Sequence, residues 1–266
     1  MKKYIIIGAS QGIGRKISEL LINKYELILC SRNISKVKKN FYKKNVFFLK
    51  FDANKQHDIN KLVKFTKLKF GKIDGIVLCQ GTIGTPEYIY NYNIETWSRI
   101  FNLNFKSNLV IIRKIFKLIR KNKFSKIIFF SGGGAFNSWE KFSAYSVAKT
   151  ALVRFSENLA AETKKFKIMV NCIAPGFIKT NIHKDNYKNF RNLEKKYMLV
   201  LKANRKVKPD YTKVIGLFNF LIKTKNMNLT GKTISANFDN WSNKNFISKL
   251  SKDKKNLTLL RKNIEN

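Results

Sequence analysis

The stretch Tyr4-Ile-Ile-Ile7-Gly8-Ala-Ser-Gln-Gly12-Ile-Gly14 decides the fold of this chain, because a short apolar run leads directly into a glycine-rich turn. An amphipathic helical pattern over about 13–22 follows the turn. Glycines let a backbone turn tightly and approach a pyrophosphate, and a helix N-terminus offers free N–H groups. A plain strand–turn–helix loop is the alternative. The context predicts a dinucleotide phosphate loop made of Gly8, Ser10, Gln11, Gly12, Ile13 and Gly14.

Short apolar runs alternate with amphipathic helical patterns along most of the chain. The runs cover 4–7, 27–30, 46–51, 75–79, 126–130, 168–173 and 233–236, and the further helical patterns cover about 57–69, 95–121, 143–165 and 210–223. Continuous apolarity is typical of strands that are covered on both faces of a parallel sheet. The alternation predicts an α/β fold, a single-domain Rossmann fold over 1–240 with a doubly wound seven-stranded parallel sheet and helices on both faces.

Two segments interrupt this alternation. The polar segment 178–208 follows a strand end, where the ligand crevice of a doubly wound sheet lies, and is predicted to act as a substrate lid. The tail 241–266 carries apolar side chains among its charges and is predicted to pack on the domain or on a neighbouring subunit. These side chains are Trp241, Phe246, Leu250, Leu257, Leu259 and Leu260.

The formal charge of +38 arises from 54 basic residues, only nine of them Arg, spread over nearly every segment. A nucleic-acid binder concentrates its charge on one stripe, usually with many Arg. The composition therefore predicts no specific nucleic-acid partner and leaves weak, nonspecific attraction to polyanions as an alternative.

The cysteines and histidines form no metal-binding or disulfide pattern. Cys30, Cys79 and Cys172 are odd in number and widely spaced, which favours reduced thiols in a cytoplasmic protein. His57 and His183 are isolated and are predicted to lie on the surface, so no metal site is expected. No apolar run reaches the length of a membrane span, and the first is too short for a signal peptide.

The second predicted strand ends in Cys30-Ser31-Arg32-Asn33. An enzyme that prefers NAD usually places an acid here to bind the ribose 2′-hydroxyl. Ser31 and Arg32 instead suit a 2′-phosphate, because a guanidinium pairs with phosphate through parallel hydrogen bonds. The pattern predicts NADP(H) in preference to NAD(H), with a solvated surface Arg32 as the alternative. Asp52, followed by Ala53, ends the third strand where it can contact the adenine.

The segment Ser143-Ala-Tyr145-Ser-Val-Ala-Lys149 opens a predicted helix and brings a phenol and an ammonium onto one face. A phenol titrates near pH 10, and a neighbouring ammonium stabilises its ionised form. Tyr145 can therefore exchange a proton with a carbonyl or alcohol oxygen, with Lys149 as its partner.

At this point the chain resembles the short-chain dehydrogenase/reductase family of the classical type, through GASQGIG, YSVAK and the segment Val170-Asn-Cys-Ile-Ala-Pro175-Gly176-Phe-Ile178-Lys-Thr180. The resemblance covers residues 1 to about 236. It implies interconversion of a carbonyl and a secondary alcohol by hydride transfer, with reduction by NADPH as the expected direction. It also implies a homodimer or homotetramer built through 95–121 and 143–165, where Val153 and Phe155 fit an interface.

The resemblance implies further site residues. Asn104, after Trp97, takes the place of the Asn that supports a proton relay, with Asn102 as an alternative register. The segment after the sixth strand is expected to lie along the nicotinamide. The implied cofactor contacts are Gln80, Gly81, Tyr145, Lys149, Pro175, Gly176, Ile178 and Thr180.

Three positions depart from the family pattern. The Asn-Asn-Ala-Gly after the fourth strand reads Leu78-Cys79-Gln80-Gly81, so this turn is held differently. The substrate-orienting serine position is Gly132, and Ser131 is the expected substitute, with Ser138 or Ser143 as alternatives. The last strand ends without the usual Val-Asp-Gly-Gly. This departure, together with the segment Ser131-Gly-Gly-Gly-Ala135, resembles a bacterial subgroup associated with surface polysaccharides.

Two other functions stay open on the sequence. One is a catalytically weakened NADP(H)-binding regulatory protein, suggested by the displaced serine and the lost Asn pair. The other is a sugar-nucleotide-modifying enzyme of surface-polysaccharide synthesis, although the chain has no room for a sugar-binding domain. Trp139, Phe142 and Phe177 flank the expected centre and either bind substrate or simply pack.

Overall fold

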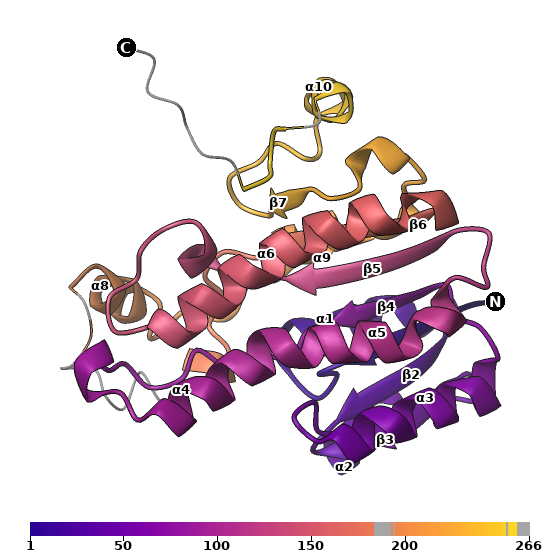
Figure 1. The fold of residues 1–266 in the computed structure, drawn as a ribbon, viewed down its shortest axis with the longest axis horizontal. Helices are drawn as coiled ribbons and strands as arrows, with labels where there is room; N and C mark the ends of the chain where they lie inside the picture. Colours follow the sequence, from indigo (N-terminus) through magenta and orange to yellow (C-terminus); the bar gives the residue numbers. More distant parts are fainter. Residues whose placement is uncertain (184–192, 194, 254, 260–266) are drawn as a thin grey trace.

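The computed structural model describes residues 1–183, 193, 195–253 and 255–259. Its seven strands form one parallel sheet in the order β3-β2-β1-β4-β5-β6-β7, which confirms the predicted doubly wound fold (Figure 1). The strands are β1 (Lys2–Ile7), β2 (Tyr25–Ser31), β3 (Val46–Lys50), β4 (Gly75–Leu78), β5 (Ser125–Phe130), β6 (Ile168–Ala174) and β7 (Thr233–Ser235).

The strand order reverses at β1, which pairs with β2 on one side and with β4 on the other. In such a sheet, ligands bind beyond the carboxyl ends of the strands at the point of reversal. The loops that follow Ile7 and Leu78 meet at this point, so the topology itself positions the site.

Helices cover both faces of the sheet. On one face lie α3 (Gln56–Phe70), α5 (Ser107–Ile119) and α6 (Ser143–Thr163), whose buried side chains share a core with Ile5 and Ile7 of β1. On the other lie α1 (Gly12–Leu21), α2 (Ile34–Phe41), α9 (Thr212–Lys223) and α10 (Lys244–Lys252), which share a core with Tyr4 and Ile6. Alternate residues of β1 thus face opposite cores, which explains its unbroken apolar run.

The helical pattern predicted over about 95–121 is confirmed, with an irregular turn inside it that the pattern did not predict. It consists of α4 (Ile94–Phe101), a π-helical turn over Asn102–Lys106, and α5. Polar side chains follow the turn, and Ser107 donates to the carbonyl of Leu103 at 2.8 Å. Such bonds back onto the chain compete with regular helix and bend it.

Of the two apolar residues predicted at a subunit interface, one lies in the core and the other is half-buried against it. Val153 is fully buried. The Phe155 ring packs against Phe105 and Phe129, with centroids 6.0 and 5.9 Å away. Val153 is thus unavailable to a partner, whereas Phe155 keeps part of its surface exposed, and an interface through α6 stays a prediction.

The tail makes defined contacts with the body of its own chain. The backbone N–H of Thr233 in β7 donates to the carbonyl of Leu257 at 2.9 Å. Lys232 Nζ donates to the carbonyls of Asp253 and Asn256, each at 2.6 Å. Residues 254 and 260–266 of the predicted tail, with Leu260, lie outside the described residues.

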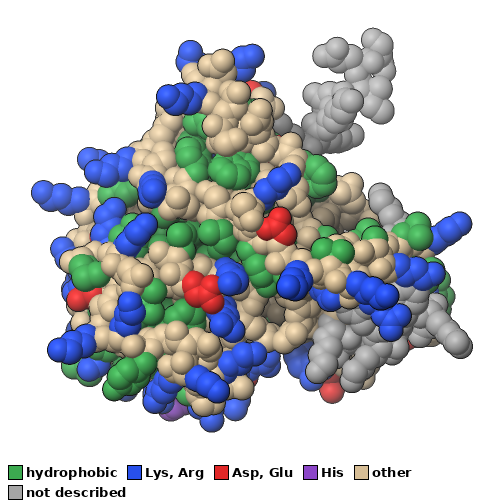
Figure 2. All heavy atoms as spheres, turned by 180° about the vertical axis from the view of Figure 1, so that it is seen from behind, with side chains coloured by type: hydrophobic (Ala, Val, Ile, Leu, Met, Phe, Trp, Pro, Cys, Tyr) green, Lys and Arg blue, Asp and Glu red, His purple; other side chains and the backbone are tan. Residues whose placement is uncertain are grey.

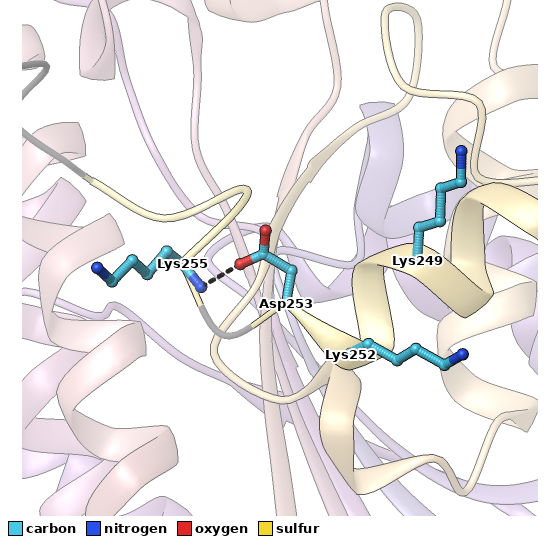
Figure 3. A pocket seen from close by; sticks show the side chains of 4 residues that line it. All are labelled: Lys249, Lys252, Asp253 and Lys255. Carbon is cyan, nitrogen blue, oxygen red and sulfur yellow. Dashed lines mark hydrogen bonds between the residues drawn. The ribbon is translucent and has the colours of Figure 1, made fainter.

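At the C-terminal end of α10, an open surface hollow is lined by Lys249, Lys252, Asp253 and Lys255 (Figure 3). The Asp253 carboxylate accepts from the backbone N–H of Lys255 at 2.7 Å, so the hollow belongs to the turn that follows α10. Elsewhere Lys and Arg are scattered over the surface without gathering into one stripe on the face in Figure 2. Among the described helices, none combines the length and apolarity that crossing a bilayer requires.

Lys126 is a buried lysine of β5, and only 4% of it is exposed. Its Nζ donates to the carbonyls of Leu221 and Thr224 at the end of α9. Burial lowers its pKa to about 7. A lysine in the unfolded chain has a pKa near 10.4. Between about pH 7 and about pH 10, Lys126 is therefore protonated more fully in the unfolded chain than in the folded one. The free energy of unfolding then rises with pH, by at most about 1.4 kcal/mol per pH unit.

We therefore expect Lys126→Met to make the rise in the free energy of unfolding between about pH 7 and about pH 9 less steep. Urea unfolding of both proteins across this window measures the difference. Lys61→Met, on the exposed side of α3, is the control and should leave the slope unchanged. Equal slopes for Lys126→Met and the parent chain would contradict the expectation.

Candidate functional site

The predicted phosphate loop lies between β1 and α1, and its glycines are required there. Gly8 and Gly12 have φ of +89° and +57°, which side chains rarely adopt. A Cβ on Gly14 would lie 2.3 Å from the carbonyl oxygen of Gly8. Gln11 precedes α1 without a side-chain hydrogen bond to its first turn. The N–H groups of this turn are therefore available to an anion, and the loop fits a pyrophosphate.

The segment after β6 lies against this loop. The Thr180 side chain is 3.5 Å from the point where a Cβ on Gly12 would stand. Asn181 Nδ2 donates to Gln11 Oε1 at 2.7 Å. The structure thus brings together the phosphate loop and the segment that was predicted to lie along the nicotinamide.

At the end of β2, Ser31 is buried and Arg32 is exposed. The Ser31 hydroxyl accepts from the backbone N–H of Asn33 at 3.2 Å. Within the described part of the chain, no hydrogen bond or ion pair involves Arg32. The nearby Arg15, by contrast, pairs with Glu19 at 2.9 Å. Arg32 is thus the guanidinium at this edge that remains available to a ligand phosphate.

The residues predicted at the adenine follow β3. The Asp52 carboxylate accepts from the backbone N–H of Asn54 at 3.0 Å, and its own N–H donates to Asp58 at 2.8 Å. Ala53 is buried. This turn lies at the carboxyl edge of the sheet, where Phe51 N–H donates to the Ser31 carbonyl at 3.0 Å.

Tyr145 and Lys149 lie in the first two turns of α6, and 6% and 4% of them are exposed. Lys149 Nζ lies 5.7 Å from the centroid of the Tyr145 ring and donates to the carbonyl of Phe130 at 2.8 Å. Burial raises the pKa of Tyr145, and the neighbouring Tyr197 and Cys172 raise it further. Burial also lowers the pKa of Lys149 to about 8. The phenol therefore holds its proton at neutral pH and can act as a donor.

Asn104 lies fully buried in the π-helical turn and faces the loop after β4. Its Oδ1 accepts from the N–H of Thr82 at 3.3 Å, and its Nδ2 donates to the carbonyl of Thr82 at 2.8 Å. A Cβ on Gly81 would lie 2.8 Å from Asn104 Oδ1 and 3.6 Å from Lys149 Nζ. The structure therefore brings Asn104, Gly81 and Lys149 together, as the sequence predicted.

The region of the missing serine has an unexpected geometry. A Cβ on Gly132 would lie 2.1 Å from the hydroxyl oxygen of Tyr145. The Ser131 hydroxyl is buried beside the thiol of Cys172 and no described residue satisfies it by the usual hydrogen-bond geometry. Of the alternatives, Ser138 is exposed, and the Ser143 hydroxyl accepts from the indole N–H of Trp97 at 3.0 Å.

An arc of aromatic rings runs from the segment after β6 to Tyr145. Phe177 stacks on His183 with centroids 4.5 Å apart, and His183 Nδ1 bonds the hydroxyl of Tyr197 at 2.8 Å. Trp139 lies edge-on to Tyr197 and to Tyr145, with centroids 4.8 and 5.7 Å away. We name these five residues the aromatic arc. Tyr197 belongs to α8 (Lys195–Ala203), the described helix of the predicted lid; residues 184–192 and 194 of the lid lie outside the described residues.

The prediction that His183 lies on the surface is wrong, because only 6% of it is exposed. Burial lowers its pKa to about 4, so the ring is neutral at physiological pH. The adjoining apolar Phe177, Ile178 and Ile182 are the sequence signal for this burial. His57, by contrast, is exposed as predicted. Across the described ranges no three His, Cys, Asp or Glu side chains gather as metal ligands do, and the three cysteines are free.

A family model described as short chain dehydrogenase matches residues 2–190. The chain belongs to the short chain dehydrogenase family. As a short-chain dehydrogenase it is an NAD(P)-dependent oxidoreductase, and the glycine cradle between β1 and α1 suits the pyrophosphate of that cofactor.

Curated relatives of this short-chain dehydrogenase are mostly reductases by name. It is 34% identical over 188 residues to dehydrogenase/reductase SDR family member 4 of Caenorhabditis elegans, covering 68% of this chain and 72% of the relative. It is 28% identical over 195 residues to the benzil reductase ((S)-benzoin forming) of Saccharomyces cerevisiae, covering 69% and 74%. It is 27% identical over 251 residues to the NADPH-dependent reductase BacG of Bacillus subtilis, covering 87% and 94%.

Solved structures have the same fold. The KRED1-Pglu enzyme matches with a TM-score of 0.79 at 23% identity, over 88% of this chain and 100% of that one. YwfH, an NADPH-dependent reductase of bacilysin biosynthesis, matches with a TM-score of 0.77 at 25% identity, over 88% and 96%.

Proposed function

We propose that this short-chain dehydrogenase is an NADPH-dependent reductase that converts a ketone into a secondary alcohol. The observation that carries the proposal is the placement of the buried Tyr145 hydroxyl one helical turn from Lys149 and next to Gly132, at the end of β5. A reduction needs a proton donor at the carbonyl oxygen, and a phenol that remains protonated at neutral pH meets this need.

The cofactor would be bound along the carboxyl edge of the sheet, and when bound it supplies the hydride. The N–H groups at the start of α1 hold its pyrophosphate, and Ser31 with Arg32 hold the 2′-phosphate. Asp52 and Ala53 border the adenine. The remaining proposed contacts are Gly81, Tyr145, Lys149, Pro175, Gly176, Ile178 and Thr180; Gln80 is not among them, because its side chain is bonded to Asn108.

Four residues carry the proposed chemistry. Tyr145 donates its proton to the carbonyl oxygen, and the Lys149 ammonium favours the phenolate that is left behind. Asn104, beside Gly81 and Lys149, supports the return of a proton from solvent. Ser131 orients the carbonyl. This role is supported by its place in the chain, because Ser131 is buried directly before Gly132, whose Cβ position lies 2.1 Å from the Tyr145 hydroxyl oxygen.

The choice of NADPH depends on Arg32, so we expect Arg32→Ala to raise the Kd for NADPH about tenfold or more and to leave the Kd for NADH nearly unchanged. Cofactor fluorescence measures both constants. Arg113→Ala removes one charge from the exposed side of α5 and is the control for the net charge of the chain. Equal weakening of NADPH and NADH by Arg32→Ala would overturn the proposed role of Arg32.

The aromatic arc favours a ketone that carries a flat apolar group. Two of its polar groups, His183 Nδ1 and the Tyr197 hydroxyl, already bond each other, so fewer polar groups remain for the hydroxyls of a sugar. The yeast relative, by its name, reduces the diaryl compound benzil. Oxidation of NADPH with a panel of aryl ketones and sugar ketones tests the proposal. Turnover of aryl ketones is expected, and turnover of sugar ketones alone would contradict it.

Nothing in the geometry favours a regulatory protein or a sugar-nucleotide-modifying enzyme over a reductase. Four expectations from the sequence stay predictions. They are similarity to the bacterial Ser-Gly-Gly-Gly-Ala subgroup, a cytoplasmic location, a small-molecule substrate without nucleic-acid or membrane partners, and a homodimer or homotetramer. Sedimentation of the purified chain would test the last of them.

A further inference from the structure

The side chain of Gln80 does not point along the loop after β4 but reaches α5. Its Nε2 donates to Asn108 Oδ1 at 2.8 Å and lies 3.4 Å from the Ser107 hydroxyl. Asn108 is 98% buried and passes the contact on, because its Nδ2 donates to the main-chain carbonyl of Asn104 at 2.7 Å. Gln80, Asn108 and Asn104 thus form one chain of amide hydrogen bonds.

This amide chain acts on a turn that is irregular. In the π-helical turn over Asn102–Lys106, the backbone N–H of Ser107 donates to the carbonyl of Asn102, five residues back, instead of to the regular helical partner. Asn108 Nδ2 ties its side chain to this turn through the carbonyl of Asn104. Both residues are buried, so water does not replace this bond when it is lost. The orientation of Asn104 therefore depends on Asn108.

The loop after β4 is held to the helix at two points, with Gly81 between them. Gln80 binds Asn108 on one side, and Thr82 binds the side chain of Asn104 on the other. Both Asn104 Oδ1 and Lys149 Nζ lie within 4 Å of where a Cβ on Gly81 would stand. A shift at either point would alter the spacing of Asn104 from Lys149.

We propose that Gln80 is a positioning residue that, through Asn108, holds the π-helical turn and keeps Asn104 beside Gly81 and Lys149. The inference rests on the proposed function, since it assigns Gln80 a part in the same site. Gln80 acts through its hydrogen bond to α5. It stands in the turn after β4, at the position where the usual family sequence Asn-Asn-Ala-Gly has Ala.

The test uses two near-isosteric variants that cannot donate, Gln80→Leu and Asn108→Leu. We expect each to lower kcat about tenfold to a hundredfold, because small displacements of catalytic groups have effects of this size, with little change in KM or in the Kd for NADPH. In the parent chain, kcat should decrease as the pH rises through the Lys149 pKa of about 8. In the two variants, the pH at which kcat decreases should be shifted. The double variant should be no worse than either single one, because both break the same chain.

The matched control is Gln56→Leu. Gln56 Nε2 makes the same kind of bond to Asn60 Oδ1, at 3.3 Å, on the exposed surface of α3. Its loss should leave kcat and the pH profile unchanged.

Three outcomes would overturn the proposal. Loss of thermal stability with unchanged kcat and pH profile would mean a purely structural role. Loss of NADPH binding in Gln80→Leu would mean direct contact with the cofactor. A normal Asn108→Leu beside a defective Gln80→Leu would mean that Gln80 does not act through Asn108.

Hydrogen exchange separates this inference from the proposed function. The Thr82 N–H is protected by Asn104 Oδ1, so both leucine variants should speed its exchange even if no carbonyl compound is turned over. Unchanged exchange would overturn the positioning role, whereas absent turnover in the parent chain would overturn the proposed function alone.

Discussion

Replacing Tyr145 by Phe should lower kcat for ketone reduction about a thousandfold, within the range usually found for loss of a general acid. The substitution removes only the hydroxyl oxygen. Tyr145 is the one tyrosine of α6, so no other phenol on this helix can replace it. Steady-state oxidation of NADPH with the best aryl ketone measures the loss.

The binding of NADPH and the melting temperature should survive this change, because the Tyr145 ring and its contact with Trp139 remain. Tyr4→Phe is the matched control: this buried tyrosine also has a raised pKa, but it lies early in β1, away from the carboxyl edge. Activity within twofold or so of the parent in Tyr145→Phe would mean that another group donates the proton.

Placing a serine at Gly132 should lower activity about a hundredfold, although the family commonly has serine there. Its Cβ would lie 2.1 Å from the Tyr145 hydroxyl oxygen, closer than any real contact. Tyr145 would have to move away from the strand, and a displacement of about 1 Å at a reacting group can cost about a hundredfold. We expect Gly132→Ser and Gly132→Ala to lose kcat/KM by this factor, with NADPH still bound.

Gly133→Ala is the neighbouring control, because a Cβ there meets nothing within 4 Å. Ser131→Ala, measured in parallel, tests whether the buried hydroxyl next to Gly132 orients the ketone. A gain of activity in Gly132→Ser would contradict this reasoning and would mean that Tyr145 makes room for the side chain.

Much of the fold was predictable because its signals are local. The apolar run 4–7, the glycines from Gly8 to Gly14 and the strand–helix alternation together determine the parallel sheet. Asn104, Gly81 and Lys149 were expected near one another, and the structure brings them together. These three residues are widely separated along the chain, so their proximity was predicted from the family pattern and not from local sequence.

What escaped the sequence depends on contacts between distant segments. The π-helical turn arises from side chains that bond back to carbonyls, and apolar periodicity does not report such bonds. The helix α2 was missed because its apolar face is narrow, with only Val37 and Phe41 buried among lysines. His183 is an isolated polar residue in sequence and finds Phe177 and Tyr197 only in the folded chain.

Among the seven strands, the central strand β1 comes first along the chain, and this order has a consequence for folding on the ribosome. β1 can pair with β2 once residues 25–31 have left the ribosome. Its other edge pairs with Gly75–Leu78 of β4, which are synthesised much later. Until then the apolar edge of β1 is open to other chains, a situation that promotes aggregation of nascent parallel sheets. The yield of soluble protein should therefore depend on how quickly synthesis passes from β1 to β4.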